Sequence, residues 1–387
     1  MKKLLVLISL FPLLVFGQAP TSTSKIPLSI PPVYVAQLNG STQYFSKTSP
    51  VNMDLNGAER IPSAQNRDFD STTTIGGWFA VGNHSISRVT TDSYSSPGSL
   101  QIVSTGAGDG GSHYITLFSA SFNPFVVGEK YTVQVRARAT LSNTKLTFQH
   151  GGIAGQTGNL SNTPGTFTLA VFNGAPPAST SLRLYLSQAD TVYLDAVSLT
   201  QAYDGVASLE AKTTGGSTQT LAGSSKSNGS RLRIWQNTAT ASVTLTDGTT
   251  SVTATNSATV NDGRDHQWDV TWSRTGNLTL YIDGVAGTGQ SITGVGAVTV
   301  DTLWIGRDEA GNSFTGTIGE KLRVRYPSLP TNIATWIAFA NTQRFIPEPP
   351  GGGTVVLRLF GKYNDAYDRS GNQGVLTNNG STPIIQK

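Results

Sequence analysis

The feature that most constrains this chain is a β-hairpin that lies far from its expected partner strand. Residues 262–285 (DGRDHQWDVTWSRTGNLTLYIDGV) alternate apolar and polar side chains around a Gly-Asn turn, and a second turn follows at Asp283-Gly284. The partner strand is absent just upstream, and its pattern lies at residues 35–56 instead. About one domain's length of unrelated sequence stands between the two segments. The sequence therefore predicts one β-sandwich interrupted by another.

The composition favours strands over helices. The chain has 387 residues, of which 13% are charged and 42 are glycine. This length accommodates two well-buried cores, and abundant Gly, Ser, Thr and Asn suit short strands joined by turns. We predict an all-β fold of two antiparallel β-sandwiches, or jelly rolls, one inserted into the other, with one short helix near residues 331–343.

The N-terminal residues have the pattern of an export signal. Two lysines precede the apolar run 4–16, which is short for a bilayer span. We expect a signal peptide at 1–18 and a linker at 19–32, with an uncleaved membrane anchor as the alternative. The expected location is secreted or cell-surface, with a virion surface also open, and without membrane contact after signal removal. The chain has no cysteine, so core burial, with or without a metal, must hold an exported fold.

Alternating patterns divide the remaining residues into two predicted domains. The outer domain takes 33–65 and 204–387, and its tail either closes its own sandwich, as we expect, or swaps onto a neighbour to form a homo-oligomer. A net charge of +4 without a clustered basic stripe argues against nucleic acid as a partner. The insert, 66–203, contains alternating runs at 99–104, 130–139, 144–150, 165–172, 181–187 and 191–200.

Segments outside the insert resemble laminin-G-like, concanavalin A-like lectin and glucanase domains. They are LNGSTQYF (38–45), QTLAGSS (219–225), the hairpin, and LWIGRDEAGNSFTGTIGEKLRVR (303–325). The family usually has a Trp-His pair on the hairpin, whereas here Gln267 separates His266 from Trp268, so no role carries over to this histidine. Glucanases of this fold carry two Glu and an Asp alternating on one strand. That run is absent here, so we expect no catalytic residue and no enzyme.

The insert resembles carbohydrate-binding modules of the xylan- and glucan-binding jelly-roll group. The matching segments are NRDFDS (66–71), SSPGSLQI (95–102), GEKYTVQVRARA (128–139) and VYLDAVSL (192–199). In that family an acidic residue of the opening motif and the Asp of the closing strand hold a structural calcium ion. The resemblance thus implies a calcium site at Asp70 and Asp195, with Asn66 and Asp68 nearby. The alternative is that Asp195 caps a turn while Asp70 is solvated.

Aromatic rings and neutral amides are the expected glycan contacts, because sugars present apolar C–H faces and hydroxyl groups. In the insert, the predicted glycan-binding residues are Tyr114, Gln149, His113, Trp78 and Tyr94, led by the first two. Core burial is the alternative for Trp78.

Two groups in the outer domain have structural interpretations. We expect most of its large aromatic residues, Trp235, Trp268, Trp272, Tyr281 and Trp304, to be core. We expect a solvated turn around Asp308, Glu309 and Asn312, with calcium or ligand binding as the alternative.

The sequence as a whole predicts a non-enzymatic carbohydrate-binding adhesion protein that recognises a polysaccharide or a cell-surface glycan. One alternative is a structural or interaction protein, such as a virion decoration or fibre protein. The other is an accessory part or a divergent form of a glycoside hydrolase. Fold resemblance alone does not choose among these.

Overall fold

The computed structural model has only β-strands as regular elements in the residues it describes, which confirms the predicted all-β fold class. The predicted helix near 331–343, the signal and the linker lie outside the described residues. Within the same described ranges, no helix is long and apolar enough to cross a membrane. The structure describes residues 34–48, 56–61, 69, 75, 77–95, 97–117, 126, 129–150, 153–175, 182–319, 323–326, 354–358, 377–379 and 384–386.

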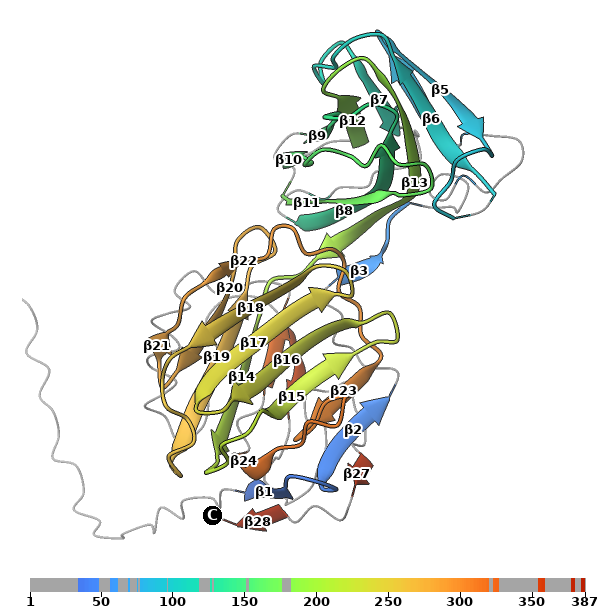
Figure 1. Ribbon diagram of the computed structural model, residues 1–387. Helices are drawn as coiled ribbons and strands as arrows, with labels where there is room; N and C mark the ends of the chain where they lie inside the picture. The colour runs from blue at the N-terminus through green and yellow to red at the C-terminus, as the bar shows by residue number, and fades with distance from the viewer. Residues whose placement is uncertain are drawn as a thin grey trace, which may run out of the picture. The chain divides into compact units, whose positions relative to one another are not determined.

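Two sheets combine strands from both ends of the described chain (Figure 1). The seven-stranded sheet has the order β18 (Ser251–Asn256), β17 (Thr240–Asp247), β16 (Ser230–Asn237), β15 (Gln219–Ser225), β23 (Thr302–Ile305), β2 (Tyr44–Thr48) and β27 (Thr377–Asn379). The main path of the ten-stranded sheet is β21 (Val285–Ala286), β20 (Asn277–Ile282), β19 (Asp265–Trp272), β14 (Gly205–Lys212), β24 (Thr315–Gly319), β1 (Tyr34–Asn39) and β28 (Ile384–Gln386). Its remaining strands are β22 (Gln290–Ser291), β25 (Arg323–Tyr326) and β26 (Thr354–Arg358).

The other two sheets take the strands between these segments. The five-stranded sheet has the order β10 (Ile153–Gln156), β9 (Leu146–His150), β12 (Leu182–Leu186), β7 (Tyr114–Leu117) and β4 (Trp78–Val81). The six-stranded sheet has the order β11 (Thr168–Gly174), β8 (Lys130–Ala139), β13 (Asp190–Ala202), β6 (Ser99–Ser104) and β5 (His84–Val89), with β3 (Asn56–Glu59) paired to β13.

The buried apolar side chains form two separate clusters, one for each pair of sheets. Both arise from strand alternation, because successive side chains point to opposite faces of a sheet. In β16, for example, Leu232 and Ile234 are buried while Arg231 and Arg233 face outward. Each pair of sheets therefore has its own core.

Strand β3 pairs with a strand of the insert. The predicted boundary at residue 65 assigned this segment to the outer domain, yet β3 pairs with the C-terminal end of β13. Strand β13 is 13 residues long, and its last residues supply a free edge for this pairing. Alternation along a single strand does not reveal its partner, so this pairing could not be predicted from the sequence, and the domain boundary at residue 65 stays a prediction.

The hairpin predicted at residues 262–285 is present. Strands β19 and β20 pair from Trp268 with Ile282 to Trp272 with Leu278. Asp283 and Gly284 both have positive φ angles, as a type I′ turn requires. Trp268 and Trp272 are buried in the core, which confirms their predicted position.

His266 lies at the start of this hairpin between two carboxylates. Its Nδ1 is 2.6 Å from Asp283 and its Nε2 is 3.0 Å from Asp262. Burial lowers the pKa of His266, but the hydrogen bonds and charges of Asp283 and Asp262 outweigh it, so the net pKa is raised. Both ring nitrogens donate only in the charged form. The arrangement therefore stabilises the protonated imidazole.

We predict that this cluster makes stability depend on pH. A histidine pKa raised by folding contributes stability fully below the unfolded value of about 6.5, and that contribution is lost as pH rises through the folded pKa. The free energy of urea unfolding should thus fall as the pH rises above about 6.5, and it should fall more steeply in the wild type than in His266→Gln. Equal slopes in the two proteins would refute a charged His266.

A loop at residues 293–298 is held by polar side chains from three strands of the six-stranded sheet. Asn173 donates to the carbonyl oxygens of residues 293 and 295, Gln134 accepts from the amide of residue 297, and Asn56 accepts from the amide of residue 298. Arg274, in the turn after β19, donates to the carbonyls of residues 295 and 296. The loop backbone thus has its polar groups satisfied where water is largely excluded.

The C-terminal tail pairs within its own chain in this structure. Strand β28 pairs antiparallel with β1, and β27 pairs with β2. The first and last described strands, β1 and β28, are therefore neighbours in the ten-stranded sheet, and β2 and β27 are neighbours in the seven-stranded sheet.

Candidate functional site

The five-stranded sheet presents a surface of aromatic and polar residues, which we call the insert face. Leu182, Leu184 and Leu186 of β12 are buried, so the alternate residues point outward. Opposite Arg183 on β7 lies Thr116, which in turn pairs with Phe79 on β4. The insert face comprises Phe79, Tyr114, Thr116, Thr147, Gln149, Arg183 and Tyr185.

The centre of the insert face is a stacked pair. The guanidinium carbon of Arg183 lies 4.5 Å from the centroid of the Tyr114 ring. Arg183 also donates a hydrogen bond of 3.1 Å to the carbonyl of Gly110. Beside them Phe79 has 43% of its surface exposed, although a phenyl ring gains from burial. These groups form a rigid surface with both apolar and hydrogen-bonding parts.

The loop 106–113 packs over one end of this face. The Asp109 carboxylate accepts hydrogen bonds from the amides of Gly111, Ser112 and His113. These bonds hold the pKa of Asp109 below its usual range. Gly110 has a φ of +69°, and a Cβ atom there would lie 2.1 Å from the Gln149 amide oxygen. The positive φ favours glycine at position 110.

Tyr114 and Gln149, the leading predicted pair, thus lie on one face. Both are accessible, since Tyr114 is half-buried and Gln149 is exposed. His113 lies in the adjoining loop, where its Nδ1 accepts a hydrogen bond of 3.1 Å from the amide of Asn83. This ring is partly exposed at the rim. The sequence therefore identified three residues at or beside the insert face.

Two other predicted contacts do not belong to this face. Trp78 is only 2% exposed and packs in the core beside Phe69, so the glycan role predicted for it is wrong. Tyr94 is 51% exposed but lies under Arg136 of the six-stranded sheet. By residue type, Trp78 and Tyr94 are both suited to contact a sugar. Only the strand pairing shows that neither side chain lies on the insert face.

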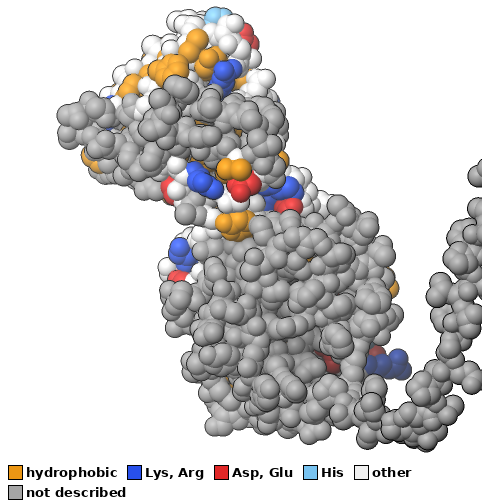
Figure 2. Space-filling view, turned by 180° about the vertical axis from the view of Figure 1, so that it is seen from behind, with side chains coloured by type: hydrophobic (Ala, Val, Ile, Leu, Met, Phe, Trp, Pro, Cys, Tyr) orange, Lys and Arg blue, Asp and Glu red, His pale blue; other side chains and the backbone are white. Residues whose placement is uncertain are grey.

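The sequence prediction missed Arg183 and Tyr185. Both lie at outward positions of the run SLRLYLS, whose alternation was recognised without assigning its outward residues. Viewed from behind, Figure 2 shows hydrophobic side chains beside Lys or Arg over the surface where β7 and β12 lie in Figure 1. Mixed surfaces of this kind are typical of ligand sites rather than of inert strand exteriors.

The predicted calcium site falls mostly outside the described residues. Asn66, Asp68 and Asp70 are not described, and Asp195 is fully buried. The Asp195 carboxylate accepts hydrogen bonds from the amides of Tyr94, Ser95 and Ala196 and from the Ser95 hydroxyl. Burial nevertheless raises the pKa of Asp195. These hydrogen bonds fit a carboxylate that stabilises the segment around Tyr94 and Ser95. The calcium site remains a prediction from the family resemblance.

The turn around Asp308 is built by internal hydrogen bonds. Asp308 accepts from the amide and side chain of Asn312 and from the Thr220 hydroxyl, and pairs with Arg233 at 3.0 Å. Burial raises the pKa of Asp308, but these hydrogen bonds and the Arg233 charge outweigh it, so the pKa lies below its usual range. Glu309 pairs with Arg231 at 2.6 Å. Asp308 is buried, so the predicted solvated turn is wrong for this residue.

The tryptophans at 235 and 304 also differ from the prediction. Most of the five large aromatic residues of the outer domain were expected in the core, yet Trp235 and Trp304 are half-buried on the outer face of the seven-stranded sheet. Tyr281 is also half-buried, so only Trp268 and Trp272 are core residues. Their chain neighbours Ile234, Leu303 and Ile305 are core residues, so the tryptophans at 235 and 304 point to the opposite face of their strands. Alternation fixes the two faces of a strand but does not show which face is buried.

Several solved domains are similar to parts of this chain. The xylan-binding domain CBM22-1 of Xyn10C from Paenibacillus barcinonensis matches at 16% identity, over 35% of this chain and 92% of that domain, with a TM-score of 0.28. Mouse laminin alpha1 domains LG4-5 match at 14% identity, over 57% of this chain and 88% of theirs, with a TM-score of 0.28. The botulinum neurotoxin serotype D ligand-binding domain, in complex with N-acetylneuraminic acid, matches at 17% identity over 36% of each chain, with a TM-score of 0.30.

These neighbours include the two kinds of domain that the sequence resemblance named. No protein-family model and no curated protein matches the chain. At TM-scores of 0.28 to 0.30, the ligands of the neighbours do not carry over to this protein.

Proposed function

We propose that this protein binds a polysaccharide or cell-surface glycan through the insert face and acts without catalysis. The observation that carries the proposal is the Arg183–Tyr114 stack beside the exposed Phe79 ring. Ring faces attract the C–H faces of sugars, and guanidinium and amide groups bond their hydroxyls. The exposed side-chain amide of Gln149 adds hydrogen-bonding groups on the same sheet.

The proposed role is adhesion by a secreted or surface-exposed protein. Sugar contacts on a shallow sheet are weak individually, so several copies on one surface would be needed for firm attachment. The non-enzymatic reading is supported by described carboxylates that hold structure, such as Glu59, which accepts from the amides of Ile61 and Leu199. A divergent hydrolase would instead release reducing sugar and would lose this activity through a single carboxylate change.

Tyr114→Ala is expected to weaken glycan binding about tenfold, since an aromatic contact is worth about 1 kcal/mol beyond the area it buries. Arg183→Ala should have an effect of similar size. The measurement is isothermal titration calorimetry with the best ligand from a glycan array that includes xylans, glucans and sialylated glycans.

The matched control is Tyr94→Ala. Arg136 lies 4.6 Å over the Tyr94 ring, nearly the geometry of Arg183 over Tyr114, but on a different sheet. Its affinity should equal that of the wild type. Unchanged binding in Tyr114→Ala and Arg183→Ala would remove the insert face from the function.

A further inference from the structure

The outer face of the seven-stranded sheet, which we call the hydroxyl face, has an unusual set of side chains. One row of directly paired residues crosses six strands, and besides one arginine and one tryptophan it contains only threonine, serine and glycine. The row consists of Thr253, Thr244, Arg233, Gly223, Trp304 and Ser46. The next row has the same character, with Ser251, Thr246, Arg231, Ser225 and Thr302.

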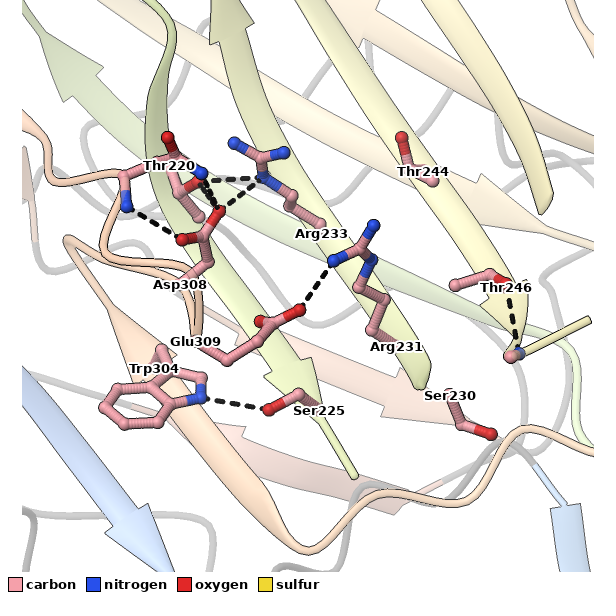
Figure 3. Close-up of polar contacts among 12 residues, drawn as sticks. Thr220, Ser225, Ser230, Arg231, Arg233, Thr244, Thr246, Trp304, Asp308 and Glu309 are labelled. Atoms are coloured by element: carbon pink, nitrogen blue, oxygen red, sulfur yellow. Dashed lines mark hydrogen bonds and ion pairs between the residues drawn. The ribbon is translucent and has the colours of Figure 1, made fainter. Parts of the chain in front are cut away.

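Trp304 is fixed in position on this face. Its indole nitrogen donates a hydrogen bond of 3.1 Å to the Ser225 hydroxyl on the neighbouring strand (Figure 3). Gly223 lies directly opposite Trp304 and places no side chain beside the ring. Because the indole N–H is already bonded, the part of the ring that is exposed offers a surface for stacking.

Trp235 and Arg233 form a second rigid element. The Trp235 indole nitrogen donates to Thr244 at 3.0 Å, and Arg233 lies 4.8 Å over the ring. Trp235 and Trp304 stand on strands separated only by β15, so about two strand spacings, or about 10 Å, lie between them across the sheet. A ligand touching both has to be longer than one sugar ring.

The charges on this face are paired. Arg231 bonds Glu309 at 2.6 Å, and Arg233 bonds Asp308 at 3.0 Å, as Figure 3 shows. A ligand that matches these paired charges carries no net charge. Protein interfaces are depleted in serine and rich in apolar area at their centre. The serine- and threonine-covered sheet is therefore matched to a neutral sugar chain rather than to a protein.

From these observations we propose that the hydroxyl face is a second glycan site, separate from the insert face, which binds a neutral polysaccharide chain with Trp304 as its main stacking platform. The accessible hydroxyl groups of Ser251, Thr253, Thr302 and Ser46, on three strands, would bond the sugar hydroxyls, directly or through water. A protein with two glycan sites could bind two polysaccharide molecules at once, or one polysaccharide molecule at two points.

The test uses the full chain and a panel of neutral polysaccharides, comprising xylan, mixed-linkage glucan and mannan, in affinity electrophoresis followed by calorimetry. Trp304→Ala should weaken binding at this site about tenfold. Gly223→Thr should block the site with little effect on folding, because a Cβ atom at Gly223 meets its nearest neighbour at an ordinary 3.4 Å. Val285→Ala, at a position that is 65% exposed in the short strand β21, is the control.

Each variant is made in the wild type and in Tyr114→Ala/Arg183→Ala, so that the two sites are separated. Residual binding in the double variant that Trp304→Ala or Gly223→Thr abolishes supports the hydroxyl face. Complete loss in the double variant, with wild-type affinity and stoichiometry in the other two, overturns this second site and leaves the insert face intact. A wild type that binds nothing on the panel overturns the neutral-glycan proposal, while the array tests the insert face separately.

Discussion

Arg274→Met is expected to destabilise the protein by about 3 kcal/mol or more, because the change leaves buried acceptors without a donor. Arg274 is fully buried, and burial lowers its pKa to about 10, against the opposing effects of Asp247 and Asp204. The guanidinium is therefore still charged at neutral pH. It donates to the carbonyls of Val295 and Gly296 at 2.8 and 2.6 Å.

Differential scanning calorimetry together with urea unfolding would measure this loss. Arg264→Met is the control, since the Arg264 side chain is 83% exposed and a surface change of this kind stays within about 0.5 kcal/mol. The scan would also show whether the two cores still unfold together. A loss below about 1 kcal/mol in Arg274→Met would mean that water replaces the guanidinium at no great cost.

Gly316→Ala should destabilise the protein by about 3 kcal/mol through its backbone. Gly316 lies in β24 between β1 and β14, with a φ of +145°. A Cβ atom there would lie 2.1 Å from the carbonyl oxygen of Lys212 on β14. Since that oxygen belongs to the backbone of a central strand, the sheet itself would have to move.

Gly294→Ala is the matched control, because a Cβ atom at Gly294 meets nothing within 4 Å and its φ is not positive. It should unfold at nearly the wild-type urea concentration. Equal midpoints for the two variants would show that the sheet yields easily at β24.

Much of the fold was predictable because strand periodicity is a local property. The run 99–104 and the run 130–139 coincide with β6 and β8. The Asp283-Gly284 turn was also predictable, since few residue pairs adopt positive φ at both positions.

The candidate site was only partly predictable, because it depends on which strands become neighbours. Tyr114 and Arg183 are far apart in sequence and meet only through the pairing of β7 with β12. The half-exposed position of Trp304 was not predicted for a related reason, since alternation does not say which face of a strand is covered. Arg274 lies in a polar hairpin turn, where its sequence gives no sign of complete burial.

The pairing of β1 with β28 has a consequence for how the chain is made. On a ribosome, the six-stranded and five-stranded sheets have all their residues as soon as β13 has emerged. The first strand, synthesised before any of them, must wait for nearly the last residues before it acquires this neighbour. Its unpaired edge is exposed throughout that time, and such edges are sites of aggregation. Translation speed and chaperone supply therefore matter most for strand β1.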